Sequence, residues 1–241
     1  MLKRLKHMLL PPYAKAAPTA FYRRDIGTMD VMHPMGPLSF RGETPRTAMH
    51  VGANTGQEFD AYRRYDFEQV TYVEPLPSAF KELTRRVNGH NGHLAVQALC
   101  MAQGGESVTL HVSNKGGLSS SVLGLGNVNT LHPEIEYVDH VETISTTVDE
   151  IVEEKLGGTA PELLILDTQG TEAEVLRGAR KALTGRTRYV FCEISHRPLY
   201  ENGCDESEIT AILDEHGFVM IFKLLNRKGW GDALYVREQE A

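Results

Sequence analysis

Short apolar segments alternate with amphipathic ones along most of the chain, and this alternation predicts strands separated by helices. Residues 47–51 and 69–73 are rich in apolar and β-branched side chains and predict two strands, with a helix over residues 57–65 between them. A second helix over residues 79–87 has its apolar positions at helical spacing and leads to a third strand over residues 94–99. This β-α-β-α-β order requires a parallel sheet with right-handed connections.

The second half of the chain continues the alternation after a strand at residues 107–112, which is expected at a sheet edge or in a hairpin. Residues 163–167 read LLILD, an apolar run typical of a buried parallel strand, ended by an acid. The other expected elements are extended segments at residues 141–146, 189–193, 218–224 and 233–236, and helices at residues 148–156, 172–183 and 207–216. The pattern predicts a single α/β domain over residues 46–241.

Two segments lie outside this pattern. Residues 114–140 are irregular and rich in glycine and serine near their start. A connection of this length in a compact domain is either a functional lid or a partly disordered insertion, and the sequence leaves both open. Residues 1–45 are expected to form an irregular N-terminal arm, because they are interrupted by Pro11, Pro12, Pro18, Pro34, Pro37 and Pro45.

Composition narrows the classes of function. With 41% hydrophobic and 24% charged residues, the 241-residue chain resembles an ordinary globular protein, and its net charge of −7 argues against a nucleic-acid partner. Cys100, Cys192 and Cys204 form no Cys-x-x-Cys pair, which favours reduced thiols, a cytoplasmic location and no zinc site. The apolar run at residues 8–10 is too short for a signal peptide, and no segment approaches the ~18 apolar residues of a transmembrane helix.

The turn after the first predicted strand is the first candidate binding site. It contains Gly52 and Gly56, which allow positive φ angles and a close approach of the backbone to a ligand. At the carboxyl end of a parallel strand, such a turn is where nucleotide-like ligands bind in open α/β sheets. Its Gly-x-x-x-Gly spacing differs from the Gly-x-Gly-x-x-Gly of dinucleotide-binding proteins, and an ordinary strand-to-helix turn is an equal alternative.

Three predicted strands end in acids, namely Glu74, Asp167 and Glu193. Because the carboxyl ends of parallel strands meet at one edge of a sheet, the three side chains are expected near a ligand bound there. Glu74 follows Gly52 by 22 residues (74 − 52), close to the roughly 20-residue offset of an acid that binds a ribose diol. One such acid alone indicates only a solvated strand end, but the set favours a nucleoside-like ligand.

Several ordered motifs together resemble the FkbM-type S-adenosylmethionine-dependent methyltransferases. They are the glycine turn, Glu74, Asp-x-x-Gly-x-Glu at residues 167–172 with Val-Leu-x-Gly at residues 175–178, and the segments 119–121 and 193–200. The resemblance covers about residues 49–222. It implies an α/β, class I methyltransferase (Rossmann-like) fold with a doubly wound, mostly parallel seven-stranded sheet and an antiparallel last strand. It also implies O-methylation of a hydroxyl on a small molecule, such as a sugar or secondary metabolite.

Two positions depart from the common pattern of that family. His50 stands where an acid often precedes the first glycine by two residues, and Gln169 stands where a glutamate often follows the fourth strand. For S-adenosylmethionine, the resemblance implies that Glu74 binds the ribose and that Ser120 lies near the cofactor. Leu99 and Cys100 either border the adenine or pack in the core. Contacts to the methionine portion are expected from the turn and its surroundings: His50, Gly52, Ala53, Asn54 and Gly56.

A hydroxyl acceptor must lose a proton during methyl transfer, which favours a nearby general base. Asp167, which is also expected beside the cofactor, is the first candidate, His196 the second, and Glu193 a further catalytic candidate. No metal ligand is expected. Two other functions use the same sheet edge and stay open, a nicotinamide-dependent oxidoreductase and a non-catalytic nucleoside-binding domain. The sequence predicts neither the acceptor nor the oligomeric state.

Overall fold

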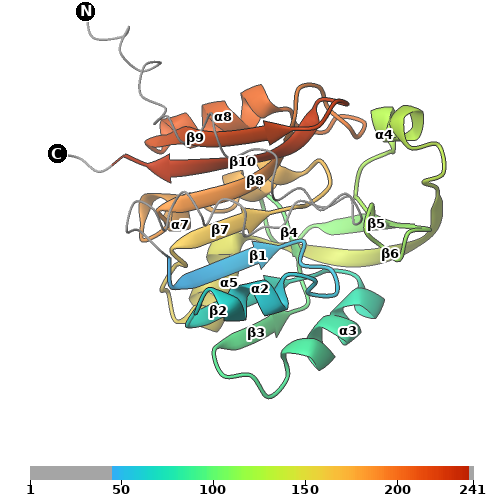
Figure 1. The fold of residues 1–241 in the computed structure, drawn as a ribbon. Helices are drawn as coiled ribbons and strands as arrows, with labels where there is room; N and C mark the ends of the chain where they lie inside the picture. Colours follow the sequence, from blue (N-terminus) through green and yellow to red (C-terminus); the bar gives the residue numbers. More distant parts are fainter. Residues whose placement is uncertain (1–44, 239–241) are drawn as a thin grey trace, which may run out of the picture.

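The structure is a computed structural model that describes residues 45–238, so the arm predicted for residues 1–45 lies almost wholly outside the described residues. Its centre is a seven-stranded sheet in the order β3-β2-β1-β7-β8-β10-β9 (Figure 1). The strands from β3 to β8 are parallel, and β10 is antiparallel to both of its neighbours. This is the predicted doubly wound sheet with an antiparallel last strand. The strands are β1 Thr47–Val51, β2 Gln69–Val73, β3 His93–Val96, β7 Leu163–Leu166, β8 Tyr189–Ser195, β9 Phe218–Leu225 and β10 Trp230–Arg237.

Helices pack on both faces of the sheet, and alternate residues of the central strands serve the two faces. Leu164 and Leu166 belong to a core shared with α5, α6, α7 and α8. Leu163 and Ile165 belong to a second core shared with α2 and α3. Continuous apolar strands are therefore required, because both faces of each strand are covered. The helices are α2 Phe59–Arg64, α3 Pro77–Val87, α5 Val148–Leu156, α6 Glu172–Arg177, α7 Arg180–Thr184 and α8 Glu206–Glu215.

A second, three-stranded sheet in the order β4-β6-β5 projects from the carboxyl edge of the main sheet (Figure 1). It consists of β4 Leu99–Cys100, β5 Ser107–Ser113 and β6 Tyr137–Thr146. The prediction of a single strand over residues 94–99 was therefore wrong. Val96 of β3 pairs with Val73, the last residue of β2, so the residues after Val96 have no strand to pair with in the main sheet. Leu99 and Cys100 pair instead with β6.

The helix predicted over residues 172–183 is also two helices, α6 and α7. Gly178 lies at the break, where a Cβ atom would come within 2.2 Å of the carbonyl oxygen of Met101. The carboxylate of Asp149 accepts hydrogen bonds from the backbone N–H groups of Lys181 and Ala182. These N–H groups lie in the first turn of α7 and have no acceptor within the helix, so α7 begins as a helix of its own. The irregular segment 114–140 contains the short helix α4, Gly126–Leu131, and the first residues of β6.

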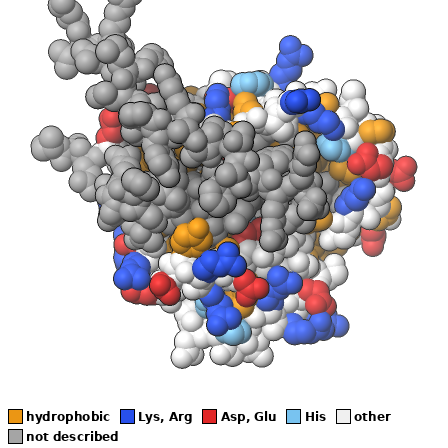
Figure 2. All heavy atoms as spheres, viewed as in Figure 1, with side chains coloured by type: hydrophobic (Ala, Val, Ile, Leu, Met, Phe, Trp, Pro, Cys, Tyr) orange, Lys and Arg blue, Asp and Glu red, His pale blue; other side chains and the backbone are white. Residues whose placement is uncertain are grey.

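The described surface carries charges of both signs. On the face shown in Figure 2, Lys and Arg side chains alternate with Asp and Glu side chains around the rim formed by the described residues. None of the helices formed by residues 45–238 is both long and apolar enough to cross a membrane.

Candidate active site

A cleft lies at the carboxyl ends of β1, β2 and β7, beneath the strap formed by residues 117–122. Its empty space, which includes open solvent at the mouth of the cleft, is about 800 Å³. Ala53, Gly56, Glu193 and His196 are not among the residues that line it. The cleft brings together the other predicted site residues: His50, Gly52, Asn54, Glu74, Leu99, Cys100, Ser120 and Asp167.

The two glycines of the turn after β1 are required both by their positive φ angles and by close packing around them. Gly52 has a φ of +87°, and a Cβ atom there would lie 1.8 Å from the carbonyl oxygen of Asp167. Any side chain would therefore push β1 and β7 apart at the floor of the cleft. Gly56 has a φ of +72°, and its added Cβ atom would lie 2.8 Å from the side chain of Leu83 on α3. Gly56 thus allows a helix to approach, whereas Gly52 shapes the cleft itself.

Glu74 is a buried carboxylate already oriented by the backbone. Its Oε2 accepts a hydrogen bond of 2.8 Å from the N–H of Asn54, and its Oε1 accepts one of 2.8 Å from the N–H of Leu76. Burial raises the pKa of Glu74 to about 7, although the two backbone hydrogen bonds oppose this rise. Each oxygen keeps a second lone pair, so the carboxylate can accept hydrogen bonds from two hydroxyls of a ligand.

His50 brings a neutral side chain to the wall of the cleft. It is 3% exposed, and its Nδ1 lies 3.0 Å from the hydroxyl oxygen of Tyr62. Burial lowers its pKa to about 4, so the imidazole is uncharged at neutral pH. Leu99 and Cys100 form an apolar part of the wall, and burial raises the pKa of the Cys100 thiol to about 12. The Ser120 hydroxyl accepts a hydrogen bond from the backbone of Ser113, which fixes the strap.

Three acids form a row across neighbouring strands. Glu193 on β8 is directly paired with Asp232 on β10, and Asp167 follows Leu166, the residue of β7 that pairs with Cys192. Strands in a sheet lie roughly 4.8 Å apart, so the carboxyl groups repel one another. Burial, together with neighbouring acids, raises the pKa of Asp167 to about 6 and holds those of Glu193 and Asp232 well above their usual range.

Sequence patterns gave no sign of Asp232. The apolar run from which the last strand was predicted begins only at Ala233, and the link to Glu193 depends on a pairing between distant segments. Alternation in residues 230–236 could have extended the strand by three residues, but not identified its partner.

Glu172, the last residue of the family motif at residues 167–172, organises the turn after β7. Its carboxylate accepts hydrogen bonds from the N–H and hydroxyl of Thr168 and from the N–H of Gly170. The thiol of Cys204 donates to its Oε2 at 3.3 Å. These hydrogen bonds compensate for the burial of the Glu172 carboxylate. They also fix the backbone of residues 168–170, directly after Asp167.

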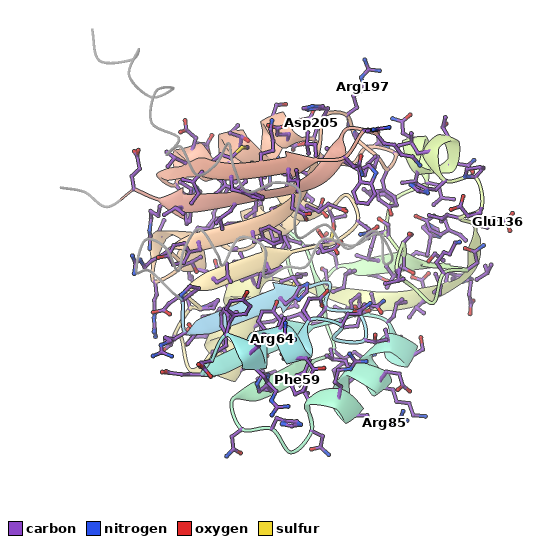
Figure 3. All side chains as sticks on the ribbon, viewed as in Figure 1. Phe59, Arg64, Arg85, Glu136, Arg197 and Asp205 are labelled. Carbon is purple, nitrogen blue, oxygen red and sulfur yellow. The ribbon has the colours of Figure 1, made fainter. Side chains whose placement is uncertain are left out.

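His196 lies away from the cleft. Its exposed side chain places Nδ1 3.2 Å from Oε2 of Glu206, on the first turn of α8. The next residue, Arg197, points out from the molecule (Figure 3). The structure therefore does not bring His196 together with Asp167, whereas the acids of the row do lie together. Among the side chains of residues 45–238, no group of three or more His, Cys, Asp or Glu is placed to hold a metal ion.

The family model described as the Methyltransferase FkbM domain matches residues 50–220, well over half of the chain. The chain belongs to the FkbM methyltransferase family. Its fold and family are those of S-adenosylmethionine-dependent methyltransferases. No curated protein sequence matches the chain.

Two solved structures agree with this assignment at the level of the fold. Methyltransferase FkbM from Methylobacillus flagellatus KT has a TM-score of 0.54 at 16% identity, over 80% of this chain and 43% of that one. This FkbM family member therefore spans less than half of that protein's length. The ribosomal protein L11 methylase of Lactobacillus delbrueckii subsp. bulgaricus has a TM-score of 0.50 at 11% identity, covering 85% and 77% of the two chains. Magnesium protoporphyrin IX methyltransferase of Synechocystis PCC 6803, solved with bound S-adenosylmethionine, has a TM-score of 0.49 at 11% identity, covering 86% and 78%.

Proposed function

We propose that this FkbM family member transfers the methyl group of S-adenosylmethionine to a hydroxyl oxygen of a small acceptor, such as a sugar or secondary metabolite. The observation that carries the proposal is the pairing of two different carboxylates in one cleft. Glu74 is held by two backbone N–H groups at the end of β2, and Asp167 follows β7. The first suits a ribose diol, and the second suits a reacting hydroxyl.

The residues of the cleft fit the chemical groups of the cofactor. Glu74 would bind the ribose hydroxyls through charge-assisted hydrogen bonds, which are stronger than neutral ones. The apolar wall at Leu99 and Cys100 suits an adenine ring, and the turn at residues 52–54 leaves room for the methionine portion. The neutral His50 can accept a hydrogen bond from the cofactor's ammonium group if its Nδ1–H donates to Tyr62. When bound, the cofactor supplies an electrophilic methyl group on a positively charged sulfur.

The work left to the protein is positioning and removal of one proton. In-line displacement depends mostly on aligning the acceptor oxygen with the methyl carbon and sulfur. Asp167 takes the hydroxyl proton as the oxygen–carbon bond forms, leaving a neutral ether and a neutral thioether. Its pKa of about 6 makes it a stronger base than an ordinary aspartate, while it remains mostly ionised at neutral pH.

Glu193 would act indirectly. It does not line the cleft, and its pKa is held well above the usual range by burial and by Asp167. The raised pKa favours protonation of Glu193, and a proton there removes one negative charge from beside Asp167 and leaves that residue free to ionise. In this role Glu193 is a positioning residue rather than a group that contacts the acceptor.

A methyl-transfer screen tests the proposal. The full chain is incubated with trideuteromethyl-labelled S-adenosylmethionine and a panel of hydroxylated small molecules, and products are sought by mass spectrometry. The proposal expects a labelled methyl ether that is absent without protein. Binding of S-adenosylmethionine without methylation of any acceptor would favour a non-catalytic domain, and binding of NAD in its place would favour an oxidoreductase.

A further inference from the structure

The side chain of Gln169 bridges two residues that come from different parts of the chain. Its Nε2 donates a hydrogen bond of 2.5 Å to Oδ1 of Asp167, and its Oε1 accepts one of 2.6 Å from the hydroxyl of Tyr200. The backbone of Gln169 is held as well, because Ser121 Oγ donates to its carbonyl oxygen at 2.8 Å. Gln169 therefore joins the end of β7 to the strap and to the loop after β8.

The backbone of Gln169 has an uncommon conformation. Its φ is +58°, in the left-handed region that non-glycine residues seldom occupy. Such a residue persists where its surroundings determine it, and these residues are concentrated at functional sites. Three hydrogen bonds to two side chains of other segments and to Asp167 provide those surroundings. The conformation directs a long amide side chain back over the residue two positions earlier.

The amide can satisfy this arrangement in only one orientation when Asp167 is ionised. An ionised carboxylate only accepts hydrogen bonds, so the N–H of Nε2 must face Asp167, and the hydroxyl of Tyr200 then donates to Oε1. The reverse orientation would bring two oxygens within 2.5 Å unless Asp167 carried a proton that it could donate. The direction of the Gln169 amide is thus coupled to the charge of Asp167, and the hydrogen bond from Tyr200 holds the amide in the orientation that the charged form requires.

We propose that Gln169, held in place by Tyr200, is a positioning residue that keeps Asp167 ionised and occupies its Oδ1, leaving Oδ2 to accept the proton of the acceptor hydroxyl. Within residues 45–238, no side chain or backbone group donates a hydrogen bond to Oδ2. The proposed role in proton removal rests on the proposed methyl transfer, whereas control of the Asp167 charge does not. Burial and the nearby Glu172 both favour protonation of Asp167, and the Gln169 hydrogen bond opposes them by lowering its pKa.

The charge of Asp167 can be measured without any acceptor. The full chain is labelled with ¹³Cγ-aspartate, the Asp167 signal is assigned from its loss in Asp167→Asn, and its chemical shift is followed against pH. Gln169→Leu removes both side-chain hydrogen bonds of residue 169, and Tyr200→Phe removes only the one that Tyr200 donates to Oε1. Gln69→Leu is the matched control, because Gln69 is exposed at the opposite, amino end of β2.

We expect the pKa of Asp167 to rise by about one unit in Gln169→Leu, a tenfold change in proton affinity. Tyr200→Phe should raise it by less, and Gln69→Leu should leave it unchanged. An unchanged or lower pKa in a folded Gln169→Leu protein would overturn the proposal, as would an unchanged pKa in Tyr200→Phe. If Gln169→Leu does not fold, Tyr200→Phe alone decides, since it leaves residue 169 intact.

Turnover provides a second, separate test once an acceptor is identified by the methyl-transfer screen. In Gln169→Leu the acidic limb of kcat/KM should move to higher pH by about the shift seen in the titration, with the KM for S-adenosylmethionine unchanged. A limb that stays in place despite a shifted titration would show that Asp167 is not the group whose charge matters. Failure of methyl transfer itself would leave the titration result standing, so the two proposals fail separately.

Discussion

The backbone N–H of Asn54 donates a hydrogen bond of 2.8 Å to Oε2 of Glu74, joining the turn after β1 to the end of β2. This bond forms between neighbouring parallel strands, and it orients the carboxylate before any ligand arrives. The same carboxylate has a pKa of about 7, so its charge is sensitive to conditions near neutrality. Because Glu74 is held in place and titrates near neutrality, the strength of cofactor binding should depend on its side chain and on pH.

Replacing Glu74 with glutamine should weaken binding of S-adenosylmethionine roughly ten- to a hundredfold, because a hydrogen bond to a charged group contributes on the order of 1.5–3 kcal/mol. The amide keeps the shape of the side chain. With only one oxygen, however, it cannot accept hydrogen bonds from both backbone N–H groups and both ribose hydroxyls. Isothermal titration calorimetry measures the change. An affinity equal to that of the unaltered protein would place the ribose elsewhere in the cleft.

Cofactor affinity should also fall as the pH drops below about 7. The free protein takes up a proton on Glu74 in this range, and binding to the ionised form must displace it, so Kd rises by up to about tenfold per pH unit. Calorimetry at pH 6 and pH 8, in buffers of different ionisation enthalpy, detects the released proton. Glu74→Gln should lose the Glu74 part of this dependence, and an equal dependence in both proteins would exclude Glu74 as its source.

Glu172 should contribute to stability more than other acids of its helix. Glu172→Ala leaves the N–H groups of Thr168 and Gly170 without their acceptor, which should lower the free energy of unfolding by about 2–4 kcal/mol. Glu174→Ala is the matched control on α6, where a partly exposed pair with Arg177 contributes less than about 1 kcal/mol. Urea denaturation compares the two, and similar losses would show that the turn is held by other contacts.

Much of the fold could be predicted from sequence because its signals are local. The bounds of β1, β2 and α5 follow from runs of apolar and β-branched residues, and from helical spacing. The split after Val96 could not be predicted, since it depends on which strand each half meets. The break at Gly178 depends on the approach of Met101, a contact between segments distant in sequence.

The candidate site divides in the same way. Glu74 and Asp167 were predicted because each follows a parallel strand. The carboxyl ends of parallel strands lie at one edge of the sheet, so both residues line the same cleft. Asp232 reaches the site through strand pairing, which no local pattern encodes. Tyr200 belongs to the segment 193–200 of the family resemblance, but its contact with Gln169 depends on loop packing. His196 follows the same strand as Glu193, but the chain has already turned outward there, so its position in sequence did not predict its position in space.

Residues 114–140 are proposed to cover the cleft. Gly117 and Ser120 line it, whereas the far part of the segment is tied down by Asn127, which donates to the carbonyl oxygen of Pro198. Adding S-adenosylmethionine should increase hydrogen-exchange protection at residues 117–122 and change it little at residues 126–131. Equal protection of residues 117–122 in the free and bound protein would make them fixed scaffold.

Removing the His196 side chain should leave cofactor binding and methyl transfer nearly unchanged. The imidazole is exposed and paired with Glu206, outside the residues that line the cleft. His196→Ala is compared with the unaltered protein by calorimetry and by initial rates on an acceptor from the screen. Loss of turnover with intact binding would instead make His196 the general base.

Single-turnover methyl transfer by Asp167→Asn tests the central claim most directly. The protein is mixed with methyl-¹³C-labelled S-adenosylmethionine and an acceptor from the screen, and the product is analysed for the atom that carries the label. We predict a labelled oxygen and a rate roughly 10²–10⁴-fold below that of the unaltered protein, with cofactor affinity nearly intact. A label on carbon or nitrogen, or an unchanged rate in Asp167→Asn, would contradict O-methylation with Asp167 as the base.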